Sequence, residues 1–394
     1  MRKSIVNRNS ISLLILVGLL YFLASCSMLK NKKIDKLSNN PLYYNYIQNN
    51  FQSYIDETEK WLINNRRFIS VNHSKELEIN MPFHIGDKDH SKKAILLVHG
   101  LNDSPFTFHD IAKDLANKGF YVQALLLPGH GSKPEDLFLP NINDWEDIVY
   151  HYSNLLRSDY EEVWLGGFST GANLITSHCL EYGGISGLLL FSPAFASRAR
   201  LFEHLSTLIP KNIDLRDFND QNNLAKYESA PLNGLIVYSE SAIKVRKLLS
   251  RFEVTIPTVI SISQEDSVVD SDKIRDFYFK KFVHRNSRLI WFGEHVSHSP
   301  RIDNFSMNLP EERISSASHM SITFDKDNFY YGKEGLKQIC HNGLGNSAEK
   351  FCTGHGQVWY GAWAEDWNNQ VHARLTWNPY YHSMMDIIFD TVVN

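Results

Sequence analysis

The 394-residue chain is predicted to adopt an α/β fold, with a mostly parallel sheet flanked by helices, and three patterns support this prediction. Short apolar runs alternate with stretches in which apolar residues recur three or four positions apart, which is typical of βα units. Several apolar runs end in glycine-containing turns. The hydrophobic content of 43% is sufficient for a large core.

The individual elements follow from these patterns. Strands are expected at five apolar runs, of which the last is interpreted as the final strand: 92–98, 121–127, 163–165, 257–263 and 289–293. Helices are expected at 103–118, 143–159, 172–182, 271–282 and 380–393. Between Ala194 and Thr255 the pattern changes to amphipathic segments at 200–208 and 242–252, which predicts a helical insertion.

A G-x-S-x-G sequence, Gly167 to Gly171, follows the run 163–165 and precedes the helix predicted at 172–182. A serine on such a sharp strand-to-helix turn projects its hydroxyl above the sheet, and bulky neighbours would collide with the strand and the helix. Ser169 is therefore the candidate nucleophile. The alternative is an ordinary glycine-rich turn.

A serine nucleophile needs a base, and the tetrahedral intermediate needs hydrogen-bond donors for its oxyanion. The strand at 92–98 ends in His99-Gly100-Leu101, where a first donor is expected. We expect the oxyanion hole to consist of the backbone amides of Leu101 and Thr170. His99, and His130 in Pro128-Gly129-His130-Gly131, are interpreted as structural residues of these loops.

His99-Gly100, Pro128-Gly129-His130-Gly131 and the serine turn, in this order and spacing, resemble the α/β-hydrolase superfamily, specifically its carboxylesterase and monoacylglycerol-lipase-like branch. The resemblance extends from about Leu77 to the C-terminus. It implies an α/β-hydrolase fold with an eight-stranded, mostly parallel sheet and a small helical cap at about 195–255. It also implies that the catalytic residues follow the chain order Ser, acid, His.

The catalytic acid is expected just after the strand at 257–263, where three carboxylates lie. Among them, Asp266 matches the acid position of the family, and it would hold the imidazole in the right tautomer and stabilise the imidazolium. The alternative is that Glu265, Asp266 and Asp270 cap a helix starting near Ser271, for which Asp270 is the better candidate.

Two positions compete for the catalytic base. His295 follows the strand at 289–293 at the ordinary distance beyond the acid. His319 lies in a Ser-His-Met-Ser stretch, which resembles a branch of secreted hydrolases whose Ser-His-x-Ser segment supplies the base and is followed by a Tyr-Gly pair and a Cys, here Tyr331-Gly332 and Cys340. On this match His319 is favoured, although its distance from the acid departs from the common pattern.

The N-terminus predicts export. Arg2, Lys3 and Arg8 precede an apolar segment, Ile11 to Ala24, that is shorter than the roughly 20 residues of a spanning helix. The ending Leu23-Ala24-Ser25-Cys26 resembles a bacterial lipoprotein signal, which implies cleavage before Cys26 and lipidation of that residue. The predicted organisation is a signal peptide at 1–25, a lipidated cysteine, tether and helical segment at 26–76, and a hydrolase domain at 77–394.

Export also bears on the remaining cysteines, because disulfides persist in oxidising compartments. Cys340 and Cys352 flank a loop rich in Gly and Asn and are predicted to pair, with a stabilisation of about 3 kcal/mol from loop entropy. Cys179 lies on the helix behind Ser169 and is expected to be a buried free thiol.

The combined prediction is an exported, membrane-anchored serine hydrolase that cleaves carboxylic esters or lipids through an acyl-enzyme, without a metal or organic cofactor. Ser27 favours the outer membrane as the site of anchoring, with the enzyme in or facing the periplasm. A net charge of −4 gives no reason to expect nucleic acid as a partner, and the oligomeric state is left open. The alternatives are a thioesterase or amidase on the same fold, or an inactive lipoprotein that binds a lipid or a partner.

Overall fold

The computed structural model describes residues 36–198, 221–294, 299–365 and 368–393. Several sequence predictions therefore fall outside the described residues. These are the signal peptide at 1–25, the lipidation of Cys26, the amphipathic segment at 200–208 and the alternative base His295.

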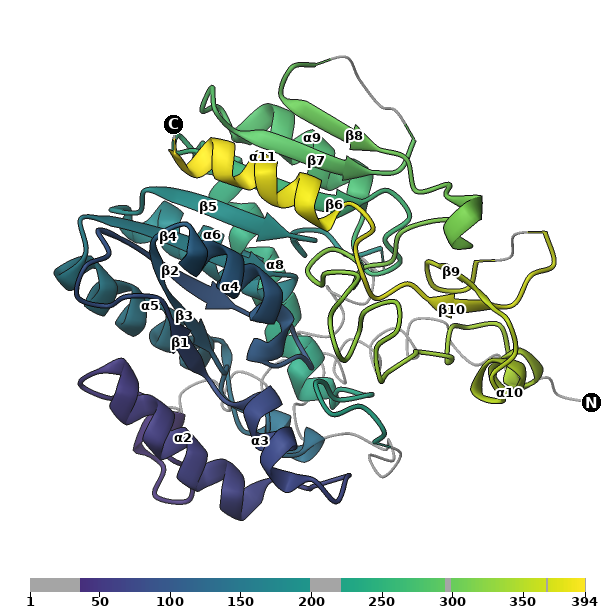
Figure 1. Cartoon of the computed structure of the whole chain (residues 1–394). Coiled ribbons are helices and arrows are strands. Elements are labelled where there is room, and N and C mark those ends of the chain that lie inside the picture. The colour runs from purple at the N-terminus through teal and green to yellow at the C-terminus, as the bar shows by residue number, and fades with distance from the viewer. Residues whose placement is uncertain (1–35, 199–220, 295–298, 366–367, 394) are drawn as a thin grey trace, which may run out of the picture.

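An eight-stranded sheet forms the centre of the molecule, in the order β1-β3-β2-β4-β5-β6-β7-β8 (Figure 1). Neighbouring strands run parallel except β1, which is antiparallel to β3. The predicted eight-stranded, mostly parallel sheet is thus confirmed. The strands are β1 Phe83–Ile85, β2 Lys93–Val98, β3 Phe120–Leu125, β4 Glu162–Phe168, β5 Gly187–Phe191, β6 Thr258–Ser263, β7 Arg288–Phe292 and β8 Ile302–Phe305.

Helices cover both faces of this sheet. The α-helices of the described chain are α2 Phe51–Asn65, α3 His73–Asn80, α4 His109–Asn117, α5 Ile142–Asp159, α6 Thr170–Tyr182, α8 Leu232–Arg251, α9 Ser271–Lys281, α10 Asn346–Thr353 and α11 Tyr381–Val393. The 3₁₀ turns are η1 Leu37–Asn39, η2 Pro105–Phe108, η3 Pro134–Phe138 and η4 Pro310–Glu312. All five helices predicted from periodicity are present, with the first divided between η2 and α4.

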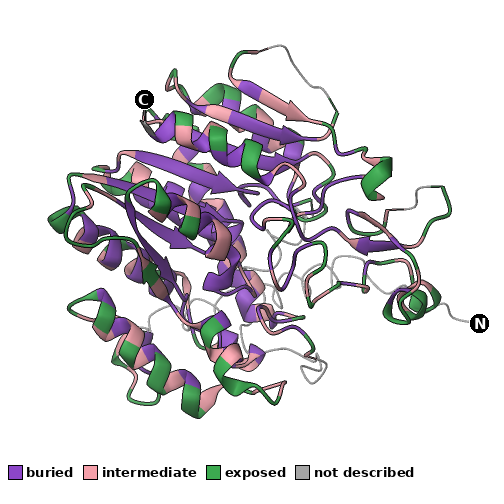
Figure 2. Ribbon diagram, in the orientation of Figure 1, coloured by how far each residue is buried: buried purple, intermediate pink, exposed green. Residues whose placement is uncertain are grey.

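The sheet is buried on both faces because alternate side chains of each strand point to opposite sides. On β2, Leu96 and Val98 belong to the same buried cluster as residues of α5, α6, α8 and α9. Ile95 and Leu97 belong to a second cluster with residues of α4 and α11. Figure 2 shows the resulting buried strands between the helical layers. This packing explains why the strands are nearly continuous apolar runs.

The prediction that the run at 289–293 is the final strand is wrong. β8 adds one more parallel strand beyond β7, and an ion pair between Arg288 and Asp303, 2.5 Å, links the two strands. β8 has only four residues, and the two in its middle, Asp303 and Asn304, are polar. A half-polar strand of this length gives no periodic signal in the sequence.

The described part of the predicted insertion contains α8, which begins ten residues before the expected segment 242–252, directly after Pro231. Its buried residues Val237, Val245 and Leu249 belong to the same core as α5 and α6. α8 therefore packs on a face of the sheet, and a cap over the serine stays a prediction.

The start of the described chain is held against α5 by one buried carboxylate. Asp144 Oδ1 accepts hydrogen bonds from the Leu37 amide, 3.0 Å, and the Tyr46 hydroxyl, 2.7 Å. Its Oδ2 accepts the Asn141 amide, 2.8 Å, in the capping box of α5. The N-terminal segment is consequently fixed from Leu37 onward.

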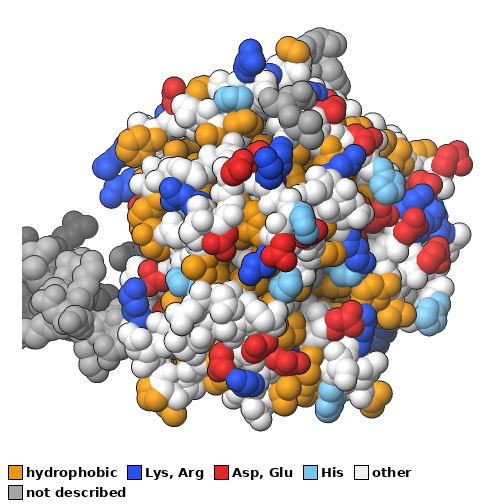
Figure 3. Space-filling model, turned by 60° about the vertical axis from the view of Figure 1, so that its left-hand side comes forward, with side chains coloured by type: hydrophobic (Ala, Val, Ile, Leu, Met, Phe, Trp, Pro, Cys, Tyr) orange, Lys and Arg blue, Asp and Glu red, His pale blue; other side chains and the backbone are white. Residues whose placement is uncertain are grey.

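The C-terminal region adds a small parallel sheet of β9 Trp359–Gly361 and β10 His372–Arg374, visible to the right of the main sheet in Figure 1. A disulfide joins Cys340 and Cys352 beside it. Figure 3 shows acidic and basic side chains interspersed over the face that it presents. Among the described helices, none combines the length and the apolar character that a membrane span requires.

Candidate active site

Ser169 occupies a strained turn between β4 and α6. Its backbone has φ 53° and ψ −115°, in the region that residues other than glycine rarely adopt, and its amide donates to the Phe191 carbonyl, 2.9 Å. The flanking glycines are required by close contacts. A Cβ at Gly167 would lie 2.5 Å from the Ala172 nitrogen, and a Cβ at Gly171 would collide with the Val98 carbonyl oxygen.

Asp266 and His319 are in direct contact. His319 Nδ1 lies 2.6 Å from Asp266 Oδ2, and the aspartate is fully buried. The other carboxylate oxygen, Oδ1, accepts the backbone amides of Val268, 2.8 Å, and Val269, 2.9 Å. These contacts fix the orientation of the carboxylate, which in turn orients the imidazole.

The imidazole of His319 lies beside the end of β4. Its ring centroid is 5.0 Å from that of Phe168, which directly precedes Ser169. The Ser192 hydroxyl donates to the His319 backbone carbonyl, 3.2 Å, and so holds the segment in place. Ser169 follows β4 and Asp266 follows β6, so both lie at the edge of the sheet where the parallel strands end.

The other acidic candidates have different surroundings. The Asp270 side chain accepts the Lys273 amide, 3.2 Å, at the N-terminus of α9, which confirms the expectation that Asp270 is the better capping residue. Glu265 lines a separate cavity beside the loop that follows β6 and carries Asp266, here called the acid loop.

The expected oxyanion donors lie on the two elements that meet at Ser169. Leu101 follows β2, and Thr170 is the first residue of α6, where the backbone amide has no intrahelical acceptor. No hydrogen bond from either backbone amide to another described residue is seen. His130 holds the loop, because its Nε2 accepts the Asn102 amide, 3.2 Å.

His99 and His130 are both buried and have the structural surroundings that the sequence suggested. His99 Nε2 accepts the Leu127 amide, 3.0 Å, so its Nδ1 carries the proton and donates to the Gly100 carbonyl, 2.7 Å. Burial lowers the pKa of His99 to about 4 and lowers the pKa of His130 well below its usual value. Both rings are therefore neutral at pH 7.

A buried carboxylate that sequence reasoning missed, Asp103, lies near the nucleophile. A Cβ built on Gly100 would lie 2.9 Å from Asp103 Oδ2 and 3.0 Å from Ser169 Cβ, so these two atoms are no more than about 6 Å apart. Burial raises the pKa of Asp103, while Lys226 and His319 act in the opposite direction. The only available signal was its position two residues after Leu101.

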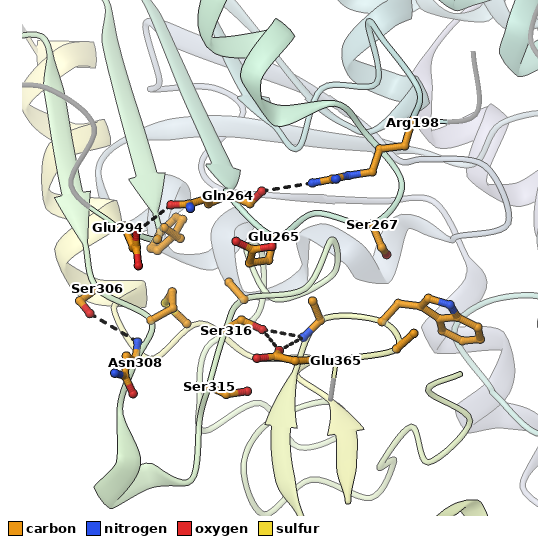
Figure 4. Close-up of a pocket in the computed structure, with 17 residues that line it drawn as sticks. Arg198, Gln264, Glu265, Ser267, Glu294, Ser306, Asn308, Ser315, Ser316 and Glu365 are labelled. Carbon is orange, nitrogen blue, oxygen red and sulfur yellow. Dashed lines mark hydrogen bonds between the residues drawn. The ribbon is translucent and has the colours of Figure 1, made fainter. Parts of the chain in front are cut away.

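Two cavities adjoin the acid loop. One, of about 400 Å³, is lined by Asn102 and Ser267, which directly follow Leu101 and Asp266. Ser267 and Trp363 line this cavity and also the second one, of about 540 Å³, which is shown in Figure 4. The first cavity is therefore bordered by the neighbours of two candidate site residues.

Three glutamates line the cavity in Figure 4: Glu265, Glu294 and Glu365. Arg198 also lines it, but its guanidinium donates to the backbone carbonyls of Asp266, 2.5 Å, and Gln264, 3.4 Å. The side chain of Arg198 thus binds the backbone of the loop that carries Asp266.

The sheet order, the strained serine turn and the Asp266–His319 contact define an α/β hydrolase, and the superfamily prediction is confirmed. Residues 89–298 match the model of the family Hydrolase_4, described as serine aminopeptidase S33, and the chain belongs to this family. The match includes Ser169 and Asp266 and ends before His319.

Individual relatives are more distant. The chain is 27% identical over 184 residues to a thermostable monoacylglycerol lipase from Bacillus sp. (strain H-257), covering 44% of this chain and 71% of the lipase. It is 21% identical over 214 residues to a carboxylesterase from Bacillus subtilis (strain 168), covering 51% and 83%. A monoacylglycerol lipase structure from Paleococcus ferrophilus aligns at 15% identity and a TM-score of 0.42, covering 54% of this chain and 87% of that one.

Proposed function

We propose that this hydrolase is a serine esterase or lipase that cleaves carboxylic esters through an acyl-serine intermediate. The observation that carries the proposal is the contact of 2.6 Å between His319 Nδ1 and Asp266 Oδ2, beside a serine on a strained strand-to-helix turn. A base that is oriented by a third group is the arrangement that activates a serine hydroxyl.

In the first half of the reaction, Ser169 Oγ attacks the ester carbonyl carbon and its proton passes to His319 Nε2. The amides of Leu101 and Thr170 donate to the oxyanion, and Asp266 stabilises the imidazolium. The carbon–oxygen bond to the alcohol breaks as His319 returns the proton to the leaving oxygen. Water then attacks the acyl-serine by the same route, releasing the acid and restoring the serine.

The ester preference is supported by two relatives of this chain, one a monoacylglycerol lipase and the other a carboxylesterase. The same machinery can cleave thioesters or amides, because the acyl-serine chemistry does not depend on the leaving group. A serine that was not activated would favour the alternative of a lipoprotein that binds a lipid or a partner.

The test uses the full chain, purified in detergent, with p-nitrophenyl esters from acetate to palmitate and with a fluorophosphonate probe that reacts only with activated serines. Turnover and labelling of the wild type, with both lost in Ser169→Ala, is the expected result. The acyl length with the highest kcat/KM separates esterase from lipase. A folded wild type that neither hydrolyses an ester nor reacts with the probe would disprove the proposal.

We also propose that the enzyme is exported and anchored through a lipidated Cys26, at the periplasmic side of an outer membrane. The support is the sequence pattern around Cys26. Intact-mass analysis of the protein recovered from bacterial membranes tests it. Cleavage before Cys26 and an added acyl mass are expected, and Cys26→Ser moves the protein to the soluble fraction. A wild-type protein that retains residues 1–25 would contradict the anchor.

A further inference from the structure

A small cavity adjoins the sequence neighbours of the candidate nucleophile and the candidate base. Phe168, which precedes Ser169, and Met320, which follows His319, both line it. Its volume of about 10 Å³ is close to the smallest that holds one water molecule. A group of about one heavy atom is therefore the largest that this cavity accepts without rearrangement.

Two oxygen-bearing side chains of the cavity wall have unused hydrogen-bonding capacity. Thr323 is fully buried, and its Oγ1 has no hydrogen-bond partner among the described residues. Asp103 is 8% exposed and also lines the cavity. Buried polar groups are normally paired, because an unpaired one loses its hydration without compensation. The unpaired hydroxyl is thus available to a polar group that a ligand brings into the cavity.

Among the described residues, the cation nearest to Asp103 leaves its carboxylate open to a further partner. Lys226 Nζ lies 3.9 Å from Asp103 Oδ1, which is beyond hydrogen-bonding distance, and 3.8 Å from the sulfur of Met320. Lys226 offsets part of the negative charge next to the oxyanion hole. The lone pairs of the carboxylate remain able to accept a hydrogen bond from a neutral or a charged donor.

We propose that Asp103 and Thr323 form a specificity subsite for a hydrogen-bond donor, a hydroxyl or an ammonium group, that the substrate carries next to its scissile ester. The distance of no more than about 6 Å between Asp103 Oδ2 and Ser169 Cβ places the donor within a few bonds of the carbonyl carbon. The donor can belong to the acyl group or to the alcohol. This proposal rests on the proposed esterase function and specifies its substrate class.

The experiment compares esters that differ only in such a donor. Methyl propionate, methyl lactate and alanine methyl ester share a three-carbon acyl skeleton and carry hydrogen, hydroxyl or ammonium on the α-carbon. Propyl butyrate and glycerol monobutyrate place the difference on the alcohol. The full chain should favour the donor-bearing member of at least one set by about 10-fold or more in kcat/KM, as a hydrogen bond to a charged group provides.

Substituents also alter the intrinsic reactivity of an ester. The measured quantity is therefore the ratio of kcat/KM for the donor-bearing ester to kcat/KM for the donor-free ester, compared between variants. Asp103→Asn and Thr323→Val should each bring the ratio toward that of uncatalysed hydrolysis. Lys226→Gln should raise the preference for alanine methyl ester over methyl lactate, because a competing cation is removed. Thr323→Val should melt at no lower temperature than the wild type, since its hydroxyl has no partner.

The matched control is Asp136→Asn. Asp136 is also a buried aspartate, 7% exposed, with a lysine nitrogen 3.9 Å away, that of Lys133, but it lies in η3. Its substitution should leave the ratio unchanged. Ratios that stay unchanged in Asp103→Asn and Thr323→Val, or that fall equally in Asp136→Asn, would overturn the subsite while esters are still hydrolysed. Absence of all turnover and of fluorophosphonate labelling would instead overturn the esterase function, and the subsite with it.

Discussion

His319 contacts Asp266 across 53 residues of sequence, and strands β7 and β8 lie between them in the chain. At the ordinary distance from the acid, the base would follow β7 directly, at His295, which was the alternative candidate. Here the chain adds β8 to the edge of the sheet and then returns to the acid. The segment that provides His319 therefore belongs to the C-terminal part of the chain, beyond the region that matches the family model.

The first prediction concerns the catalytic residues. Ser169→Ala and His319→Ala should each lower kcat for p-nitrophenyl butyrate by at least about 1000-fold, because nucleophile and base act as a unit. Asp266→Asn should cost about 1000-fold or more, since an amide favours the wrong imidazole tautomer. His295→Ala is the control and should keep its activity. Loss of activity in His295→Ala with retention in His319→Ala would reverse the assignment.

A second prediction concerns the tight packing behind the nucleophile. Gly171→Ala should destabilise the fold by more than about 3 kcal/mol, because the new methyl group would meet backbone that cannot move independently. Gly183→Ala, at the other end of α6, meets open space, so its cost of about 1–3 kcal/mol comes from backbone strain alone. Urea denaturation of both variants measures the difference. Equal stabilities would show that the turn has room for a side chain.

Acidification should destabilise the fold through the buried histidines. Burial lowers the pKa of His99 to about 4, below its unfolded value near 6.5, so the unfolded state takes up the proton first. The contribution of neutral His99 to the free energy of unfolding is on the order of 3 kcal/mol. It is complete above about pH 6.5 and is lost as the pH falls from about 6.5 toward 4. The free energy of unfolding, measured from pH 8 to 4.5, should fall less steeply in His99→Gln. Equal slopes in the wild type and in His99→Gln would contradict the prediction.

The disulfide gives a fourth prediction. Replacing Cys340 and Cys352 by serine should lower the free energy of unfolding by about 3 kcal/mol, since the bond closes a loop with a sequence separation of 12. Cys179→Ser serves as the control, because this half-buried cysteine is free. Burial raises the pKa of the Cys179 thiol to about 12, so it should react slowly with iodoacetamide in the folded protein. Equal stabilities of the reduced and oxidised protein would contradict the prediction.

Elements with a strong local signal were predictable from the sequence. The apolar runs of β2, β4 and β6 were recognised because both of their faces are buried, and the Gly167–Gly171 turn located Ser169. The contact between Asp266 and His319 agrees with the assignment made from sequence order and resemblance, and their catalytic roles stay predictions.

The remaining features depend on contacts between distant segments. β8 is too short and too polar to show a period, and its place is set by pairing with β7. Asp103 and Thr323 lie 220 positions apart in the sequence, and no local pattern indicates that they line one cavity. Such a site becomes visible only when the fold has brought its walls together.

The attachment of Leu37 to α5 through Asp144 has a consequence for where the enzyme works. If Cys26 carries lipid, the ten residues 27–36 are the whole length of chain between the bilayer and the first fixed residue. Even fully extended, such a chain spans at most about 40 Å. The hydrolase domain would then stay within this distance of the membrane that holds the lipid. Only esters that reach this region could be cleaved.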